Sequence, residues 1–322
     1  MPLKVLVTAQ MPEEWFDPLV RVGHDIVLGE GLLDHDGLVD KAREVDAIVS
    51  VLTDPIDAAV LESGARGSLR VVGNIAVGYD NIDVVRAAEL GIAVCNTPGV
   101  LDAATADVTM FLILACTRRA SAAEFALRSG AWTGWGLTNF LGSDLEGSTL
   151  GLVGYGRIAR AVERRANGFS MRVLHHTRHD SGRPGFVADL DQLMSESDVI
   201  SVHVPLTPET SGLIDARRLR LMRRGGAVVN TARGGIVDED ALVDALESGE
   251  LASAGLDVFV GEPHVDARLL SAPHLILLPH IGSATWGTRS KMALLACDDV
   301  CRVLDGQAPV NPVHATAAQP AR

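Results

Sequence analysis

Short apolar runs alternate with amphipathic stretches along the first third of the chain. The apolar runs predict five strands, at Lys4–Thr8, Asp25–Leu28, Ala47–Leu52, Arg70–Ile75 and Ile92–Asn96. Between these strands the spacing is helical, for example over Asn81–Leu90, which ends before Gly91. This alternation is typical of a parallel sheet that is covered by helices on both faces.

A second series of the same kind follows a long helical stretch at about Ala103–Arg128, which we expect to bridge two lobes. Its predicted strands are Thr149–Val153, Arg172–Thr177, Val199–Val204, Ala227–Thr231, Ser253–Val258 and Leu275–Leu278. Its predicted helices are Arg157–Asn167, Asp215–Arg223 and Asp238–Ser248. A last apolar helix at about Thr285–Leu304 belongs to neither series by order alone. Because 322 residues is long for one hydrophobic core, we expect two doubly wound α/β lobes.

The charge balance excludes several classes of partner. The chain carries 28 Lys and Arg against 41 Asp and Glu, a formal net charge of −13, whereas nucleic acid and anionic membranes require a basic surface. The longest apolar run, Val108–Cys116, is far shorter than the roughly 20 residues of a membrane span. Any anionic substrate must therefore be bound by local cations and not by the net charge.

The N-terminus and the cysteines favour a cytoplasmic protein. The first residues, MPLKVLVTA, lack the basic segment and apolar core of an export signal. Cys297 and Cys301 share a predicted helix, and their spacing is not the paired spacing of a zinc site. We interpret the four cysteines as small buried side chains in a reducing compartment, and we expect no metal.

A glycine loop at 154–159, GYGRIA, follows a predicted strand and opens a predicted helix. The backbone amides and the positive helix end of such a loop suit a pyrophosphate, and small residues allow its close approach. The motif alone is a weak sign, but strand–helix–strand context on both sides favours a dinucleotide site. The loop residues expected at the cofactor are Gly154, Tyr155, Gly156, Arg157 and Ile158.

The residues after the next strand bear on which cofactor is used. An NAD site is expected to carry an acidic residue about 20 positions after the glycines. That place falls on Thr177 and Arg178, and arginine is the residue that accommodates a 2′-phosphate. An alternative is an arginine stacked on adenine in an enzyme that uses NAD, and the nearby Asp180 leaves that alternative open. We favour NADP(H) over NAD(H).

Three polar residues occur just past predicted strand ends in the second lobe. Arg233 follows AVVNTA, Glu262 follows SAGLDVFVG and His280 follows LILLP. In a doubly wound sheet these ends share one edge with the glycine loop. The residue types suit carbonyl reduction: histidine can give a proton, a carboxylate stabilises the imidazolium, and arginine can grip a substrate carboxylate. Singly, they could be a solvated cation, a helix cap and a turn residue.

Other polar residues near strands receive weaker assignments. His175, His176 and His203 show no metal spacing, and we expect them to pack in the core or behind the site. Asp257 ends its predicted strand, where it could be structural or could contact the nicotinamide amide; we favour the second.

Six segments form a pattern far more specific than the glycine loop alone. They are VGNIAVGYDNID at 72–83, NTPGVLDAATAD at 96–107, GLVGYGRIA at 151–159, NTARGGIVDEDAL at 230–242, GLDVFVGEP at 255–263 and PHIGSAT at 279–285. With these segments the chain resembles the D-isomer-specific 2-hydroxyacid dehydrogenase family over nearly its whole length. The third small residue of the glycine loop is Ala159, which the fingerprint tolerates.

The resemblance implies a flavodoxin-like substrate domain, 1–99 plus 285–322, and an inserted Rossmann-type NAD(P)-binding domain at 100–284, with the active site in the cleft between them. It implies that Arg233 orients the substrate carboxylate and that Glu262 and His280 form the acid–base pair. The other substrate residues that it implies are Val77 and Gly78 through their amides and, at the far end of the substrate, Ser283 and Arg289. Further cofactor contacts that it implies are Pro205, Thr231, Ala232 and Gly282.

Within that family, residues 130–147 and the pair Thr177 and Arg178 are most similar to glyoxylate and hydroxypyruvate reductases. This similarity implies NAD(P)H-dependent reduction of small 2-oxoacids and a homodimer formed through the nucleotide-binding domain. Trp135 is then expected either to reach the partner's substrate pocket or to serve as a plain interface aromatic.

Three other classes of protein share part of this pattern. A phosphoglycerate dehydrogenase usually carries extra regulatory sequence beyond the last helix. A formate dehydrogenase would be expected to have glutamine in place of Glu262. A nucleotide-sensing corepressor could retain the arginine, glutamate and histidine, although it would be expected to have long tails. Turnover with small oxoacids would exclude the corepressor.

Overall fold

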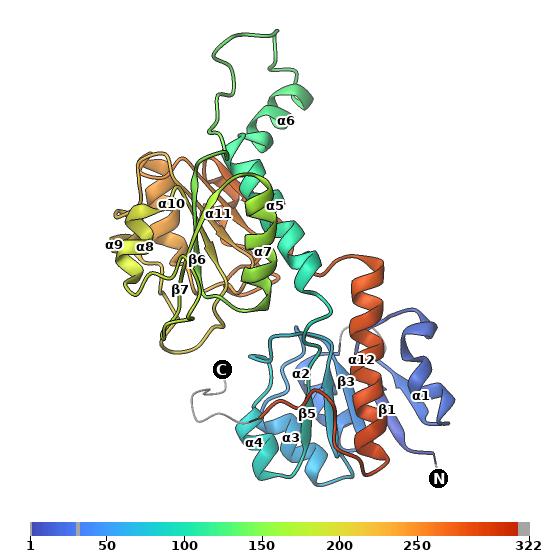
Figure 1. The fold of residues 1–322 in the computed structure, drawn as a ribbon. Coiled ribbons are helices and arrows are strands. Elements are labelled where there is room, and N and C mark those ends of the chain that lie inside the picture. The colour runs from blue at the N-terminus through green and yellow to red at the C-terminus, as the bar shows by residue number, and fades with distance from the viewer. Residues whose placement is uncertain (1, 30–32, 315–322) are drawn as a thin grey trace. The chain divides into compact units, whose positions relative to one another are not determined.

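The computed structural model describes residues 2–29 and 33–314, and the chain divides into two compact units (Figure 1). Unit 1 comprises Met1–Leu101 and Ala284–Arg322, and unit 2 comprises Asp102–Ser283. Of the predicted substrate domain, residues 1, 30–32 and 315–322 lie outside the described residues. Each unit is built on its own parallel sheet, which confirms the predicted α/β class.

Unit 1 contains a five-stranded sheet in the order β2-β1-β3-β4-β5, and all of its strand pairs are parallel. The strands are β1 (Lys4–Val7), β2 (Asp25–Leu28), β3 (Ala47–Ser50), β4 (Val71–Asn74) and β5 (Ala93–Cys95). All five were predicted, with ends that differ by no more than two residues. The central strands are buried along their whole length, so they read in the sequence as continuous apolar runs.

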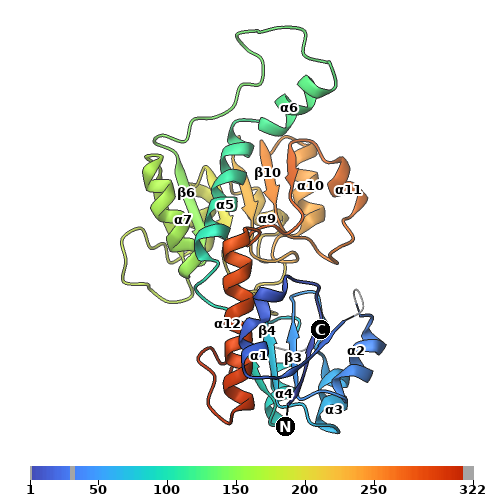
Figure 2. The ribbon, with the colours of Figure 1, turned by 90° about the vertical axis from the view of Figure 1, so that its right-hand side faces the viewer.

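Helices cover both faces of the unit 1 sheet (Figure 2). One face is packed by α2 (His35–Ala42), α3 (Ala58–Ala65) and α4 (Val84–Glu89). The other face is packed by the 3₁₀ helix η1 (Glu13–Phe16), by α1 (Asp17–Arg21) and by α12 (Trp286–Leu304). The last helix of the chain therefore supplies part of the core of the first unit.

The segment after α12 covers the β5 edge of the same sheet. The Asn96 amide donates to the Asn311 carbonyl (3.2 Å), and the Val313 amide donates to the Val94 carbonyl (2.8 Å). The buried carboxylate of Asp299, on α12, accepts from the backbone amides of Val310 and Asn311. Helix α12 and this segment thus close one face and one edge of unit 1.

Unit 2 contains a six-stranded parallel sheet in the order β11-β10-β9-β8-β6-β7. The strands are β6 (Thr149–Val153), β7 (Arg172–His176), β8 (Val199–Val202), β9 (Ala227–Asn230), β10 (Ser253–Leu256) and β11 (Leu275–Leu277). All six were predicted, and again the differences are at the ends. Strand order reverses at β6, so the glycine loop leaves the sheet beside the point of reversal.

Helices cover both faces of this sheet as well (Figure 1). Helices α5 (Asp102–Thr117) and α7 (Arg157–Gly168) pack on one face. On the other face lie α8 (Leu190–Glu196), α9 (Ala216–Leu219), α10 (Glu239–Glu247) and α11 (Ala267–Ser271). In the described part of the chain, no helix is long and apolar enough to cross a membrane.

The predicted long helix at Ala103–Arg128 is wrong in one respect, because the structure divides it. Helix α5 ends at Thr117, and α6 (Ala120–Arg128) begins after Arg119, which has a left-handed φ of 52°. The chain returns past this point, and the Ser143 amide donates to the Thr117 carbonyl at 2.8 Å. This bond from a distant segment takes an acceptor that a continuous helix would use.

Helix α6 and residues 129–147 form an arm that extends from the rest of unit 2 (Figures 1 and 2). No residue of α6 is buried. The arm carries a series of exposed large apolar side chains: Phe125, Leu127, Trp132, Trp135, Leu137 and Leu141.

Candidate active site

The predicted catalytic and cofactor-binding residues of unit 2 lie at one edge of its sheet. Because all six strands are parallel, their carboxyl ends meet at the same edge. The glycine loop follows β6. The other predicted residues follow the remaining strands: Thr177 and Arg178 (β7), Pro205 (β8), Thr231, Ala232 and Arg233 (β9), Asp257 and Glu262 (β10), His280 and Gly282 (β11).

The glycine loop has the backbone that a dinucleotide requires. Gly154 has a left-handed φ of +93°, and a Cβ atom there would meet the His203 carbonyl oxygen at 2.7 Å. Gly156 is the N-cap of α7, which has no side-chain cap, and a Cβ on Gly156 would enter open space. The first amides of a twelve-residue helix are thus available to an anion, so these residues fit a pyrophosphate.

The loop after β7 is ordered by short-range hydrogen bonds. The Thr177 hydroxyl donates to the His179 carbonyl (2.6 Å), and the Asp180 carboxylate accepts from the Gly182 amide (2.8 Å). Glu209, in the loop after β8, has a lowered pKa: hydrogen bonding from Thr207 is the main cause, and the charge of Arg178 adds to it. Arg178 therefore acts electrostatically on the loop that follows the neighbouring strand end.

His280 and Glu262 form a direct pair at this edge. The His280 Nδ1 atom lies 2.7 Å from Glu262 Oε2, and both side chains are about three-quarters buried, with 24% and 23% of each exposed. The other carboxylate oxygen, Oε1, accepts from the Phe259 amide at 2.8 Å. With Nδ1 engaged, the Nε2 atom of His280 is the one that remains to exchange a proton with a substrate.

The surroundings keep Glu262 ionised. Burial alone raises its pKa, but the hydrogen bonds from His280 and the Phe259 amide, with the charges of His280 and Arg233, outweigh burial and lower the pKa overall. The charged carboxylate bonds Nδ1 and so fixes the orientation of the imidazole ring.

Asp257 fixes the backbone of the two residues that follow His280. It is 1% exposed, and its two oxygens accept from the amides of Ile281 (2.7 Å) and Gly282 (2.8 Å). Burial is the largest influence on Asp257 and raises its pKa, although both bonds oppose this shift. His280 itself has a left-handed φ of 52°, which costs energy for a side chain with a Cβ. The Asp257 bonds help to fix that conformation.

Arg233 lies in a loop that is shaped by a residue the sequence analysis did not assign. The buried Asn230 side chain donates to the Arg233 carbonyl (2.6 Å) and accepts from the Ala232 amide (3.0 Å). Gly234 packs so closely on the loop after β10 that a Cβ atom would meet the Phe259 carbonyl carbon at 2.1 Å. An asparagine at the end of an apolar strand was the available signal for this role.

The structure places three further histidines in or near the core of unit 2, as expected: His175, His176 and His203. His175 is buried and stacks on Tyr155 of the glycine loop, with ring centroids 3.7 Å apart. His176 Nδ1 lies 3.1 Å from the Val187 carbonyl, and His203 Nε2 lies 2.8 Å from the Ser201 hydroxyl. Burial lowers the pKa of His203 to about 4, so this ring is neutral at pH 7. Tyr155, which we predicted to contact the cofactor, thus also stabilises the glycine loop by stacking on His175.

The other predicted substrate residues are distributed over both units. Val77 and Gly78 lie in the loop after β4 of unit 1, and Arg289 lies on α12. Ser283 is the last residue of unit 2, and Trp135 is 83% exposed on the arm.

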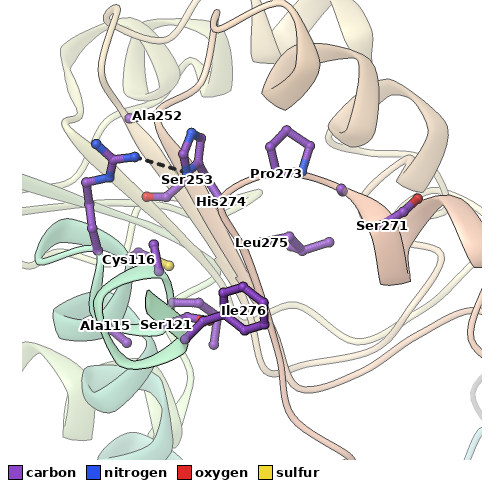
Figure 3. A pocket seen from close by; sticks show the side chains of 14 residues that line it. Ala115, Cys116, Ser121, Ala252, Ser253, Ser271, Pro273, His274, Leu275 and Ile276 are labelled. Atoms are coloured by element: carbon purple, nitrogen blue, oxygen red, sulfur yellow. Dashed lines mark hydrogen bonds between the residues drawn. The ribbon is translucent and has the colours of Figure 1, made fainter. Parts of the chain in front are cut away.

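A pocket of about 470 Å³ lies at the opposite, amino edge of the unit 2 sheet (Figure 3). It is lined by α5, α6 and the segments that lead into β10 and β11, with Cys116, Ser253 and Leu275 among its walls. At its rim, Arg119 Nη2 and His274 Nδ1 are 3.5 Å apart. None of the predicted site residues lines this pocket, so it is separate from the carboxyl edge.

Comparison with known proteins agrees with the fold and with the glycine loop. Residues 110–282 match the family described as "D-isomer specific 2-hydroxyacid dehydrogenase, NAD binding domain". The chain is 42% identical to a glyoxylate reductase of Thermococcus onnurineus over 330 aligned residues, 98% of this chain and 96% of that protein. It is 41% identical to a glyoxylate reductase of Pyrococcus furiosus over 324 aligned residues, with the same two coverages, 98% and 96%.

A solved structure extends the similarity to three dimensions. The NADPH-dependent glyoxylate/hydroxypyruvate reductase of Sinorhizobium meliloti, in complex with NADP and malonate, superposes with a TM-score of 0.87 at 33% identity and 100% coverage of both chains. Two parallel α/β sheets, a glycine loop and these similarities define an NAD(P)-dependent oxidoreductase. The chain belongs to the D-isomer specific 2-hydroxyacid dehydrogenase family and resembles its glyoxylate reductases.

Proposed function

We propose that the protein reduces small 2-oxoacids, glyoxylate and hydroxypyruvate, to the corresponding 2-hydroxyacids, with NADPH as the preferred cofactor. The observation that carries this proposal is the His280–Glu262 pair at 2.7 Å, at the sheet edge where the glycine loop also emerges. The similarity to curated glyoxylate reductases over almost the whole chain supports the choice of substrate.

The reaction assigns a role to each predicted catalytic residue. A reduced nicotinamide, when bound, supplies the hydride that adds to the carbonyl carbon. His280 gives a proton from Nε2 to the carbonyl oxygen, which completes the hydroxyl group, and Glu262 stabilises the imidazolium before this transfer. Arg233 binds the substrate carboxylate and polarises the adjacent carbonyl.

We assign the other substrate contacts to residues of both units and the other cofactor contacts to unit 2. In unit 1, we propose that the amides of Val77 and Gly78 bind the substrate carboxylate and that Arg289 contacts the far end of the substrate. We propose the same far-end contact for Ser283 of unit 2. The unit 2 residues Pro205, Thr231, Ala232, Asp257 and Gly282 are to complete the cofactor site. Their common position after strand ends supports this assignment.

The loop after β7 supports the preference for NADPH. Thr177 offers no carboxylate to the ribose hydroxyls, and Arg178 offers a cation to a 2′-phosphate. Asp180, which left NAD open as an alternative, already accepts the Gly182 amide within a local turn. Its carboxylate is therefore engaged within its own loop.

We further propose that the chain forms a homodimer through unit 2, with the arm as a principal contact. The arm exposes several large apolar side chains, of which Trp135 and Leu137 are 83% and 78% exposed. An exposed apolar series of this kind is typical of a protein interface. A second copy of the same chain is the occupant that the family resemblance supports.

The experiment that tests the proposed function is a comparison of initial rates. NADPH and NADH oxidation are followed at pH 7 with glyoxylate, hydroxypyruvate and pyruvate. Rapid oxidation of NADPH with glyoxylate or hydroxypyruvate is the expected result. A preference for NADH would reject the role of Thr177 and Arg178 and leave the catalytic residues in place. The absence of oxidation with every pair would reject the proposed activity.

A further inference from the structure

Three consecutive carbonyl groups are held by hydrogen bonds in the loop after β4. The Ala76 carbonyl accepts from the Thr97 amide at 2.9 Å. The Val77 carbonyl accepts from Asn96 Nδ2 at 2.8 Å, and the Gly78 carbonyl accepts from Asn74 Nδ2 at 3.0 Å. Within residues 2–29 and 33–314, neither the Val77 amide nor the Gly78 amide donates to a protein acceptor.

The direction of the two amides follows from peptide geometry. In a planar trans peptide, the carbonyl of one residue and the N–H of the next point in opposite directions. Two adjacent residues, Asn96 and Thr97, hold the carbonyls of Val77 and Ala76. The N–H groups of Gly78 and Val77 therefore point away from the groups that hold these carbonyls, and both remain available to an anion.

We propose that Asn96 is a positioning residue for the substrate carboxylate, an inference that rests on the proposed function. Its side chain does not touch the substrate. It fixes the Val77–Gly78 peptide so that the Gly78 amide meets the carboxylate without first having to rotate. Preorganised donors of this kind bind an anion more strongly than donors that must be reoriented.

The position of Asn96 separates this role from that of a general structural residue. Asn96 is only partly buried, and its side chain makes one described bond, to the Val77 carbonyl. Ser68 offers a control in the same unit. It precedes β4, at the opposite end of that strand from the loop with Val77 and Gly78, and its hydroxyl donates to the Val45 carbonyl at 3.4 Å. Asn81 would not serve, because its Oδ1 accepts from Asn74 Nδ2, which also holds the Gly78 carbonyl.

The test compares Asn96→Ala and Ser68→Ala in the full-length protein, with glyoxylate varied at saturating NADPH. For Asn96→Ala we expect the KM for glyoxylate to rise roughly tenfold, the loss of about one hydrogen bond to a charged group. We expect kcat and the KM for NADPH to stay within about twofold of the wild type. The contact to the carboxylate is equally strong in the ground state and in the transition state, so its loss affects the KM for glyoxylate alone. Reduction of glycolaldehyde, which has no carboxylate, should be unaffected.

Two further variants guard against a simple effect on folding. Asn96→Gln keeps the amide and should recover part of the lost affinity. Asn96→Ser has a hydroxyl too short to reach the Val77 carbonyl and should behave as Asn96→Ala does. Ser68→Ala should leave the KM for glyoxylate unchanged. An unchanged KM in both Asn96→Ala and Asn96→Ser, or an equal rise in Ser68→Ala, would overturn the assignment.

The failure of this inference can be told apart from failure of the proposed function. If the wild type turns over glyoxylate and the Asn96 variants match it, only the role of Asn96 is rejected. If the wild type turns over no oxoacid, oxalate binding is measured instead by calorimetry in the presence of NADPH. A roughly tenfold weaker affinity in Asn96→Ala would then support the inference. Equal affinities, or no oxalate binding to the wild type, would reject it.

Discussion

The two ends of strand β11 are flanked by histidines with similar φ angles and very different surroundings. His274 precedes the strand and His280 follows it, and both have a left-handed φ, 58° and 52°. His274 is exposed, and its Nδ1 atom lies 3.5 Å from Arg119 Nη2. His280 is largely buried and bonds Glu262 at 2.7 Å, beside a backbone that Asp257 holds.

This contrast teaches that neither a left-handed φ nor a nearby pocket identifies the histidine that we propose as the proton donor. The amino edge has the 470 Å³ pocket, but its histidine faces a cation across a long contact. The carboxyl edge has carboxylates whose oxygens are each engaged by a donor, so the geometry around His280 is fixed in advance. Fixed polar geometry is what a proton transfer requires.

Replacement of His280 gives the largest expected effect. His280→Ala should lower kcat for glyoxylate reduction by roughly 10²–10⁴-fold, the usual contribution of a general acid. Binding of NADPH, measured by fluorescence titration, should change little because the glycine loop is untouched. A kcat close to that of the wild type would show that His280 does not donate the proton.

Removal of the charge of Glu262 should have the next largest effect. Glu262→Gln should reduce kcat by roughly 10–100-fold, the range expected for one hydrogen bond to a charged partner. The steady-state rate at pH 7 is the measurement, and Glu239→Gln serves as a control because Glu239 bonds the Val260 amide of the same loop without touching His280. Equal losses in both variants would indicate a general disturbance of the loop.

The same variant has a predicted effect on acid stability. The pKa of Glu262 is lower in the folded protein than its ordinary value of 4.5, so its carboxylate stabilises the fold above about pH 4.5. This contribution is lost as the pH falls through the lowered pKa. The difference in melting temperature between the wild type and Glu262→Gln should therefore shrink from pH 7 to pH 3. A constant difference would contradict the shift.

The two ends of β7 allow a smaller effect to be tested. Arg172 opens the strand and pairs with Glu196 at 3.4 Å, whereas Arg178 follows the strand at the carboxyl edge. Arg178→Ala should lower the ratio of kcat/KM for NADPH to that for NADH roughly tenfold, since a charged contact to a phosphate is lost. Arg172→Ala should leave this ratio unchanged. The ratio is obtained from initial rates with each cofactor.

The amino edge gives the smallest expected effect. His274→Ala removes an exposed ring from the rim of the pocket, so kcat should stay within about twofold and the free energy of unfolding within about 0.5 kcal/mol. Urea denaturation and steady-state rates check both values. A loss of kcat comparable to that of His280→Ala would remove the distinction between the two edges.

The sequence predicted those parts of the structure that depend on buried strands. The strands of both sheets read as continuous apolar runs, and parallel topology then places the residues after them at one edge. For this reason the sequence could predict that Glu262 and His280, which follow two different strands, lie close together. The roles assigned to these residues in catalysis remain predictions.

The features that could not be predicted depend on contacts between distant segments. The break between α5 and α6 depends on Ser143, which returns to bond Thr117. The roles of Asn230 and Asn96 depend on which carbonyl each side chain meets in the folded loops. An asparagine that bonds the backbone of a distant loop has the same neighbours in the sequence as an asparagine in a solvated turn. One sequence alone therefore does not separate the two cases.

In the sequence, unit 2 is inserted between the two segments of unit 1, and this affects the order in which the units fold during synthesis. Residues 102–283 are contiguous, so unit 2 can complete its core before α12 is made. One face of the unit 1 sheet waits for Cys297, Val300 and Leu304 on that helix, and until then its apolar strands are exposed on a nascent chain. We expect a chain that stops after residue 283 to keep a protease-resistant unit 2 while unit 1 is degraded.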